Sequence, residues 1–338
     1  MSYLFPSATI TFDAALRDLA SGSPKARTLA AHALGGVTDP VERRRALDAL
    51  TRALDDDRPE VRAEACSSLG ELGEPGAIAA LIKRLADGAA PVRQNAAIAL
   101  GTMRATEGFD PLAEALANGP ADLRFQAATS LAEVDPARAF EFVVKALDDK
   151  DPQVVGAAAL SVGAIASELG DATKRETAQA ALAPKLDHSD PGARFDIAYA
   201  LADLDDARGK PTLAAALNDE GRAWDAVTAL ARLRAMTELA QAVAGKKTPN
   251  EAATLAAGRL LALDPEHAAA KKAIVDALTH RKVHVRGIAI EQLGEIGGAW
   301  AKEPLDKLAH SGKGSELLEP IANALRAIEG RHPTEGRA

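Results

Sequence analysis

Two histidines stand at a spacing that can hold a metal ion. His280 and His284 are four residues apart, and side chains at that spacing share one face of a helix. Arg281 and Lys282 lie between them, however, and the pair spans an expected turn. The sequence contains no HExxH, no CxxC and no His-Glu dipeptide. We therefore expect no metal site and no cofactor, and we interpret both histidines as ordinary surface residues.

Nucleophiles and phosphate loops are equally sparse. Cys66 is the single cysteine, and the only histidine expected on its own or an adjacent second helix is His32, in a distant row. The segment 311–314, SGKG, contains a Gly-Lys pair, but Lys307 stands where a P-loop requires its first glycine. The segment 70–76, GELGEPG, spaces glycines three apart with no strand before them. We accordingly predict that the chain is not an enzyme.

The elements that would position these residues recur with a fixed period. Within residues 47–163, one slot repeats every 31 residues, a leucine lies eight residues before it, and a short polar residue lies six before it. The repeated slot is occupied by Arg62, Arg93, Arg124 and Val155, and the polar residues are Asp56, Asp87, Asn118 and Asp149. A period of this length indicates a stack of supersecondary units.

Each row encodes two helices joined by a turn. Apolar residues at 3–4 spacing in 47–54 predict a first helix, the DDDRP segment at 55–59 predicts a turn, and 61–72 predicts a second helix. Because one pair cannot bury its apolar face alone, neighbouring pairs must stack. We predict an all-α fold, a right-handed α-α superhelix of about ten helix pairs. Residues 13–330 are expected to form a single solenoid, 1–12 an apolar tail or cap, and 331–338 a disordered tail.

Three runs carry a family resemblance: DRPEVRAEACSSLGELG (57–73), GAAPVRQNAAIALGTM (88–103) and HRKVHVRGIAIEQLGEIG (280–297). They resemble HEAT repeats, specifically the short bacterial type also seen in phycobilin-lyase-like proteins. The resemblance implies a polar ladder in which Asp and Arg side chains bond between neighbouring repeats. We assign a structural ladder role to Asp56, Arg62, Asp87, Arg93, Arg124, Arg194 and Arg286.

The charge and composition limit the class of protein. The formal net charge of −8 disfavours general nucleic-acid binding, which needs a basic surface. One cysteine favours a reducing compartment. The amino-terminal segment lacks the pattern of a signal peptide, and we find no run of eighteen apolar residues that would predict a membrane span. We expect a cytoplasmic, bacterial protein. Nothing in the pattern indicates an oligomeric state.

One set of positions is unexpectedly aromatic. The slots one and five residues after the ladder position point away from the apolar face of the second helix, and in HEAT solenoids that face lines the concave side. Aromatic residues are 3% of the chain, yet these slots hold Phe125, Phe195, Tyr199 and Trp224. We predict a concave groove that binds a protein or peptide partner, with Asp196, Asp203 and Asp225 favouring a partner of basic character. The alternative is that the rings fill gaps against the neighbouring repeat.

The functional prediction is a non-enzymatic protein-protein interaction scaffold or adaptor. The alternative is an enzyme or enzyme subunit of the phycobilin-lyase-like or DNA-glycosylase-like HEAT class. A glycosylase of that class uses a Trp and a catalytic Asp in a basic groove. Trp224 and Asp225 are adjacent here, but their neighbourhood is not basic.

Overall fold

The computed structural model describes residues 10–331, and every regular element in that range is a helix. Phe12 begins the first helix and Arg331 ends the last. Most of the predicted tails, residues 1–9 and 332–338, lie outside the described residues. The chain divides into two compact units, one ending at Asp196 and one beginning at Ile197. The prediction of one continuous solenoid over 13–330 stays a prediction.

The described helices form ten consecutive pairs, as predicted for a HEAT-like solenoid. The first helices of the pairs are α1 (Phe12–Ser21), α3 (Pro40–Ala53), α5 (Ile78–Arg84), α7 (Phe109–Asn118), α9 (Pro136–Ala146), α11 (Ala172–Leu182), α13 (Lys210–Ala216), α15 (Met236–Ala244), α17 (Ala268–Ala277) and α19 (Lys302–Ala309). The second helices are α2 (Pro24–Gly35), α4 (Pro59–Leu72), α6 (Ala90–Thr102), α8 (Ala121–Val134), α10 (Pro152–Leu169), α12 (Pro191–Asp203), α14 (Ala223–Arg232), α16 (Asn250–Leu263), α18 (Val283–Ile296) and α20 (Leu318–Arg331).

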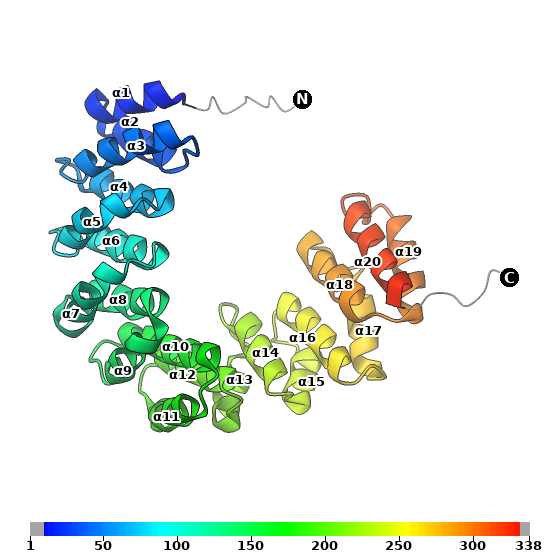
Figure 1. Cartoon of the computed structure of the whole chain (residues 1–338). Helices are drawn as coiled ribbons and strands as arrows, with labels where there is room; N and C mark the ends of the chain where they lie inside the picture. The colour runs from blue at the N-terminus through cyan, green and yellow to red at the C-terminus, as the bar shows by residue number, and fades with distance from the viewer. Residues whose placement is uncertain (1–9, 332–338) are drawn as a thin grey trace. The chain divides into compact units, whose positions relative to one another are not determined.

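Within unit 1 the helices form two layers (Figure 1). The second helices α2, α4, α6, α8 and α10 pack on one another along the whole unit. The first helices touch one another far less. The second helices therefore form the more closely packed of the two layers. In unit 2 the second helices α14, α16, α18 and α20 also pack in sequence.

Turn chemistry sets the helix boundaries. Proline occupies the first turn of many helices, where its missing N–H costs nothing. Asp39 caps α3 by accepting hydrogen bonds from two backbone N–H groups, and Asp135 and Asp151 cap α9 and α10 by accepting one each. The DDDRP segment predicted from the sequence as a turn ends where α4 begins, at Pro59.

Glycine permits the second helices to approach closely. An added Cβ at Gly70 in α4 would lie 2.9 Å from the Cα of Ala99 in α6, and one at Gly35 in α2 would lie 2.9 Å from the Cα of Ser68 in α4. Gly294 in α18 meets Ala324 in α20 in the same way, at 3.2 Å. The recurrent glycine eight residues after the ladder position is therefore a packing requirement between repeats.

We expect Gly70→Ala to reduce the free energy of unfolding by about 1–3 kcal/mol, because the new methyl group overlaps the α6 backbone. Gly287→Ala is the matched control, since Gly287 also lies in a second helix but an added Cβ meets nothing within 4 Å. That variant should gain about 0.5–1 kcal/mol, because glycine disfavours helix interiors. Urea unfolding of both variants measures the difference, and equal effects would contradict the packing role.

Helix α10 is the described helix that comes nearest to a membrane span. Its 18 residues have a mean hydropathy of 1.3, so length and composition alone would allow a crossing. However, 61% of that window is buried inside the fold, where α10 packs on α8 and α9. Burial of this kind is typical of a core helix.

Candidate functional site

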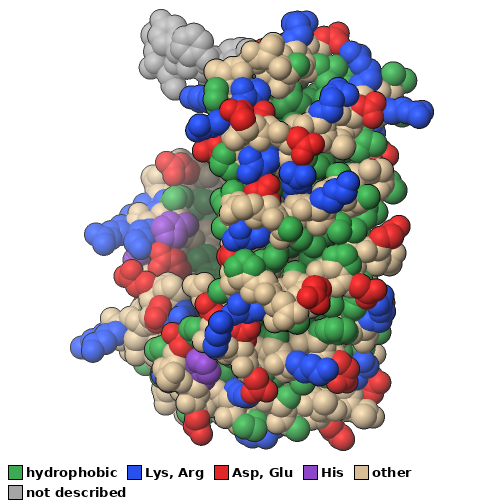
Figure 2. Space-filling view, turned by 90° about the vertical axis from the view of Figure 1, so that its left-hand side faces the viewer, with side chains coloured by type: hydrophobic (Ala, Val, Ile, Leu, Met, Phe, Trp, Pro, Cys, Tyr) green, Lys and Arg blue, Asp and Glu red, His purple; other side chains and the backbone are tan. Residues whose placement is uncertain are grey.

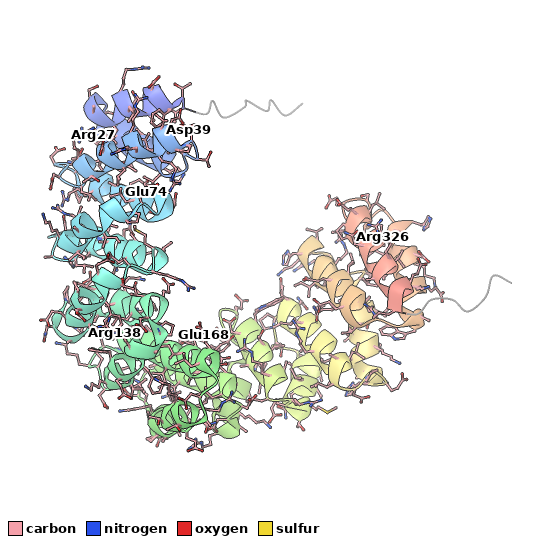
Figure 3. The ribbon with its side chains drawn as sticks, viewed as in Figure 1. Arg27, Asp39, Glu74, Arg138, Glu168 and Arg326 are labelled. Carbon is pink, nitrogen blue, oxygen red and sulfur yellow. The ribbon has the colours of Figure 1, made fainter. Side chains whose placement is uncertain are left out.

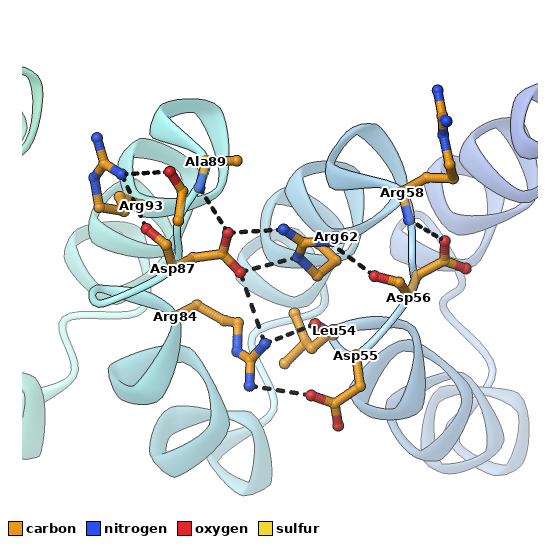
Figure 4. A network of polar contacts seen from close by, with 10 residues as sticks. Leu54, Asp55, Asp56, Arg58, Arg62, Arg84, Asp87, Ala89 and Arg93 are labelled. Atoms are coloured by element: carbon orange, nitrogen blue, oxygen red, sulfur yellow. Dashed lines mark hydrogen bonds and ion pairs between the residues drawn. The ribbon is translucent and has the colours of Figure 1, made fainter.

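The ladder of unit 1 joins successive repeats through ion pairs. Arg62 in α4 donates two hydrogen bonds to Asp87, which lies before α6, with both N–O distances at 2.9 Å (Figure 4). Its remaining Nη donates to the backbone carbonyl of Asp56 at 2.9 Å. The Asp87 carboxylate is itself fixed by the backbone N–H of Ala89. Each arginine thus ties its own turn to the turn of the next repeat.

The same bonding recurs with one change of partner. Arg27 pairs with Asp56 at 2.8 Å and Arg124 with Asp149 at 2.7 Å. In repeat four the polar slot holds Asn118, which carries no charge and cannot form an ion pair with Arg93. Arg93 instead bonds Asp122, four residues further on, at 2.8 and 3.0 Å.

The last two predicted ladder members behave differently. Arg194 donates to the backbone carbonyls of His188 and Ser189, and Arg286 donates to those of His280 and Arg281. Among the residues that the structure describes, Arg286 has no carboxylate partner, and its Nε is buried without an acceptor. The prediction that this residue bonds a neighbouring repeat is therefore wrong, because Ser311 holds the polar slot of the turn that follows and Glu316 of that turn forms no ion pair with Arg286.

The ladder is linked to acid stability. The Arg62 hydrogen bonds hold the pKa of Asp87 below its usual value. A carboxyl group with a lowered folded pKa stabilises the fold above its unfolded pKa, near 3.9, and loses that contribution as the pH falls through the folded pKa. We therefore expect Asp87→Asn to destabilise the protein most at pH 7 and progressively less below about pH 4. Urea unfolding at pH 7 and pH 3 tests this, and a constant difference would contradict it.

The exposed side of the second helices in unit 1 has a regular composition. Positions five and nine residues after the ladder slot are exposed or half-buried in α4, α6, α8 and α10. These positions are Ser67, Glu71, Ile98, Thr102, Thr129, Glu133, Leu160 and Ala164. Together with Phe125 in α8 they form what we call the second-helix face.

Three large apolar side chains stand on this face. Ile98 is 42% exposed, and Phe125 and Leu160 are each 38% exposed. They belong to α6, α8 and α10, which are consecutive second helices in direct contact. Ile98 was not part of the aromatic pattern and was missed, although it lies in the same slot as Leu160.

The four aromatic residues predicted to line one exposed groove do not all lie on an exposed surface. Phe195 is only 6% exposed, so its assignment to an exposed groove is wrong. The position one after the ladder lies about 60° from the centre of the exposed side, at 100° per residue. Whether a side chain there is exposed depends on the neighbouring second helix. Phe125 is exposed, whereas the equivalent Ala63 is buried.

The other proposed groove residues lie in unit 2 or at its edge. Tyr199 is half-buried beneath the Arg232 guanidinium, 5.4 Å from its ring centre, and Arg232 also forms an ion pair with Asp203. Asp203 is therefore already neutralised. The carboxylate of Asp196 lies where a side chain at Gly156 would stand. Asp225 is exposed.

Trp224 belongs to a separate site in unit 2. It is 43% exposed and borders a cavity of about 320 Å³ together with Glu220, Pro249 and Glu251. Burial raises the pKa of Glu251, but hydrogen bonds from its own backbone N–H, from His284 and from Lys282 outweigh burial and lower it to about 2. Lys282 also lines the cavity but is paired with Glu251, so two acids and one lysine beside Trp224 do not form the basic groove of a DNA-glycosylase-like site.

The remaining chemical candidates are separated from one another. The ring of His284 bonds Glu251, whereas His280 accepts from the backbone N–H of Lys282. Within residues 10–331 no three His, Cys, Asp or Glu side chains gather closely enough to hold a metal ion. Cys66 is buried, and burial raises the pKa of its thiol to about 12. It is therefore a neutral thiol near pH 7 and not an activated nucleophile.

Comparison with known families agrees with this geometry. A model of HEAT repeats matches residues 14–101 and 109–173, and a model of the PBS lyase HEAT-like repeat matches residues 92–118. The part of the chain that these models match, residues 14–173, is similar to HEAT repeats. The resemblance read from the sequence is thereby confirmed. No curated protein sequence matches the chain.

Solved structures share the fold. The Kap95:Nup1 complex matches with a TM-score of 0.62 at 11% identity, over 94% of this chain and 51% of that one. Importin beta matches with a TM-score of 0.55 at 14% identity, over 94% and 52%. The complex of CpcE and CpcF of phycocyanin lyase from Nostoc sp. PCC7120 gives a TM-score of 0.45 at 20% identity, over 78% and 99%. The first two likenesses show the fold alone, and this chain spans about half the length of those two proteins.

Proposed function

We propose that this protein is a non-enzymatic scaffold that binds a segment of a partner protein on the second-helix face of unit 1. The observation that carries the proposal is the row formed by Ile98, Phe125 and Leu160. These apolar side chains stay exposed on three consecutive second helices. Apolar side chains placed on a preformed surface are typical of protein-binding sites.

The geometry of the repeats suits such a role. The ladder ion pairs and the close glycine contacts fix the second helices before any partner arrives. A preformed surface loses little conformational entropy on binding. Kap95, a chain of the same fold, occurs in a complex with Nup1. Cys66, the histidines and Trp224 offer no converging catalytic group, which supports a binding role over an enzymatic one.

A matched pair of phenylalanines tests the proposal. Phe125 on second helix α8 and Phe142 on first helix α9 are 38% and 40% exposed. A peptide is first selected from a random library on the whole wild-type chain. We expect Phe125→Ala to weaken its binding by about 2 kcal/mol, and Phe142→Ala to leave binding unchanged. Isothermal titration measures both.

The stability of these variants serves as the control. Phe142 also packs edge-to-face on Phe109, with the ring centres 5.7 Å apart, so Phe142→Ala should unfold at the lower denaturant concentration of the two, and binding is compared where both variants are fully folded. A selected peptide that binds Phe125→Ala as tightly as the wild type, or that is lost with Phe142→Ala, would contradict the proposed surface.

A further inference from the structure

Charges are segregated between the two helix layers of unit 1. In the second helices α4, α6, α8 and α10 there is no lysine, and the only arginines are the ladder residues Arg62, Arg93 and Arg124. All three are paired to Asp87, Asp122 or Asp149. None of the arginines in these four helices is therefore free to pair with a partner, although α2 at the start of the layer carries the exposed Lys25.

The opposite layer is different. The first helices α3 and α9 carry arginines and lysines beside acids, α5 carries Lys83 and Arg84 without an acid, and α7 carries acids alone. Figure 2 views the structure from the first-helix side of unit 1 and shows Lys and Arg interspersed with Asp and Glu. Figure 3 labels Arg138 of α9 toward that side and Glu168 of α10 toward the second-helix side.

Two acids of the second-helix face, and a third beside it, lack ion-pair partners. Glu71 and Glu133 lie on the face in the last turns of α4 and α8, and Glu168 lies beyond it in the last turn of α10. All three are exposed, and none forms an ion pair with another described residue. Glu71 and Glu133 lie over Gly35 and Gly101 of the preceding repeats. The carboxylates therefore flank the apolar row along its length.

We infer that the occupant of this face is a lysine- or arginine-rich protein segment that also presents apolar side chains. This inference rests on the function proposed above. The apolar row supplies the contacts that bury surface, and the unpaired carboxylates select the sign of the partner's charge. Nucleic acid and anionic lipid surfaces have the wrong sign. Neighbouring second helices lie about 10 Å apart, so the partner's apolar side chains should recur at about that spacing.

The test uses three fluorescent 20-residue peptides with the full-length protein. One alternates lysine and leucine in an amphipathic pattern, the second replaces every lysine with glutamate, and the third replaces every leucine with serine. We expect the lysine–leucine peptide to bind at least tenfold more tightly than either of the others. Its affinity should fall as salt rises, because exposed charges are screened.

Two charge-reversed variants distinguish the effect of the charges on the second-helix face from the effect of the net charge of the chain. One carries Glu71→Lys, Glu133→Lys and Glu168→Lys on or beside the second-helix face. The other carries Glu107→Lys, Glu141→Lys and Glu176→Lys, three exposed acids outside it. The net charge changes equally in both. We expect the first variant to lose at least tenfold in affinity for the lysine–leucine peptide and the second less than threefold.

The outcomes distinguish the inference from the function on which it rests. Equal losses in the two variants, or tighter binding of the glutamate–leucine peptide, would overturn the charge assignment. If Phe125→Ala still weakened the glutamate–leucine peptide, the face would bind protein segments and only the partner's charge would be wrong. If Phe125→Ala left every peptide unaffected, both the inference and the proposed surface would fail. Self-association of the wild-type chain that is lost with Phe125→Ala would show a second copy as the occupant and overturn the inference.

Discussion

Arg62→Ala should reduce the free energy of unfolding by about 2–4 kcal/mol. The substitution removes two charged hydrogen bonds and leaves Asp87, whose side chain is 5% exposed, without its main partner. Arg93→Ala should cost less, about 1–3 kcal/mol, because the side chain of its partner Asp122 is more exposed. Chemical denaturation of the purified variants measures both losses.

The control for the ladder is Arg58→Ala. Arg58 lies one turn before Arg62, and its side chain forms only an exposed 3.6 Å pair with Glu60. Its loss should change stability by no more than about 0.5 kcal/mol. The double variant Arg62→Ala and Asp87→Ala should cost less than the sum of the two single variants, because the pair is removed together. Strict additivity would show that the two side chains do not stabilise one another.

Phe195→Ala should be the most destabilising single change among the aromatic residues considered, at about 3–5 kcal/mol. Its ring is buried, so truncation leaves a cavity in addition to losing apolar contacts. Trp224→Ala should cost much less, because nearly half of that side chain is exposed. Thermal unfolding separates the two cases. A Phe195→Ala protein as stable as the wild type would contradict the assignment of Phe195 to the core.

The fold could be predicted because the repeats of residues 47–163 share one pattern. The period of 31 residues recurs with each helix pair, and the glycine eight residues after the ladder slot reflects close packing between neighbouring second helices. The exchange of Asp122 for Asn118 as the partner of Arg93 could also have been anticipated. Asn118 carries no charge, and Asp122 lies one helical turn away.

The exposed apolar row of the proposed binding surface was predicted less well, for a geometric reason. The prediction relied on aromatic residues at the position one after the ladder slot. That position lies at the edge of the exposed side of the second helix, where Phe125 is exposed and Phe195 is not. The position five residues after the ladder slot lies nearer the centre of the exposed side. The apolar residues Ile98 and Leu160 at that position indicate the exposed apolar row. Arg286 illustrates a second limit, because a ladder arginine can be read from one repeat but its acceptor belongs to the next.

Photo-crosslinking tests the central claim most directly. A benzophenone amino acid replaces Phe125 in one protein and Phe142 in another, and each is irradiated with the peptide selected on the wild-type chain. Binding on the second-helix face predicts a crosslinked product from position 125 and none from position 142. A product from position 142 alone, or equal yields from both, would contradict it.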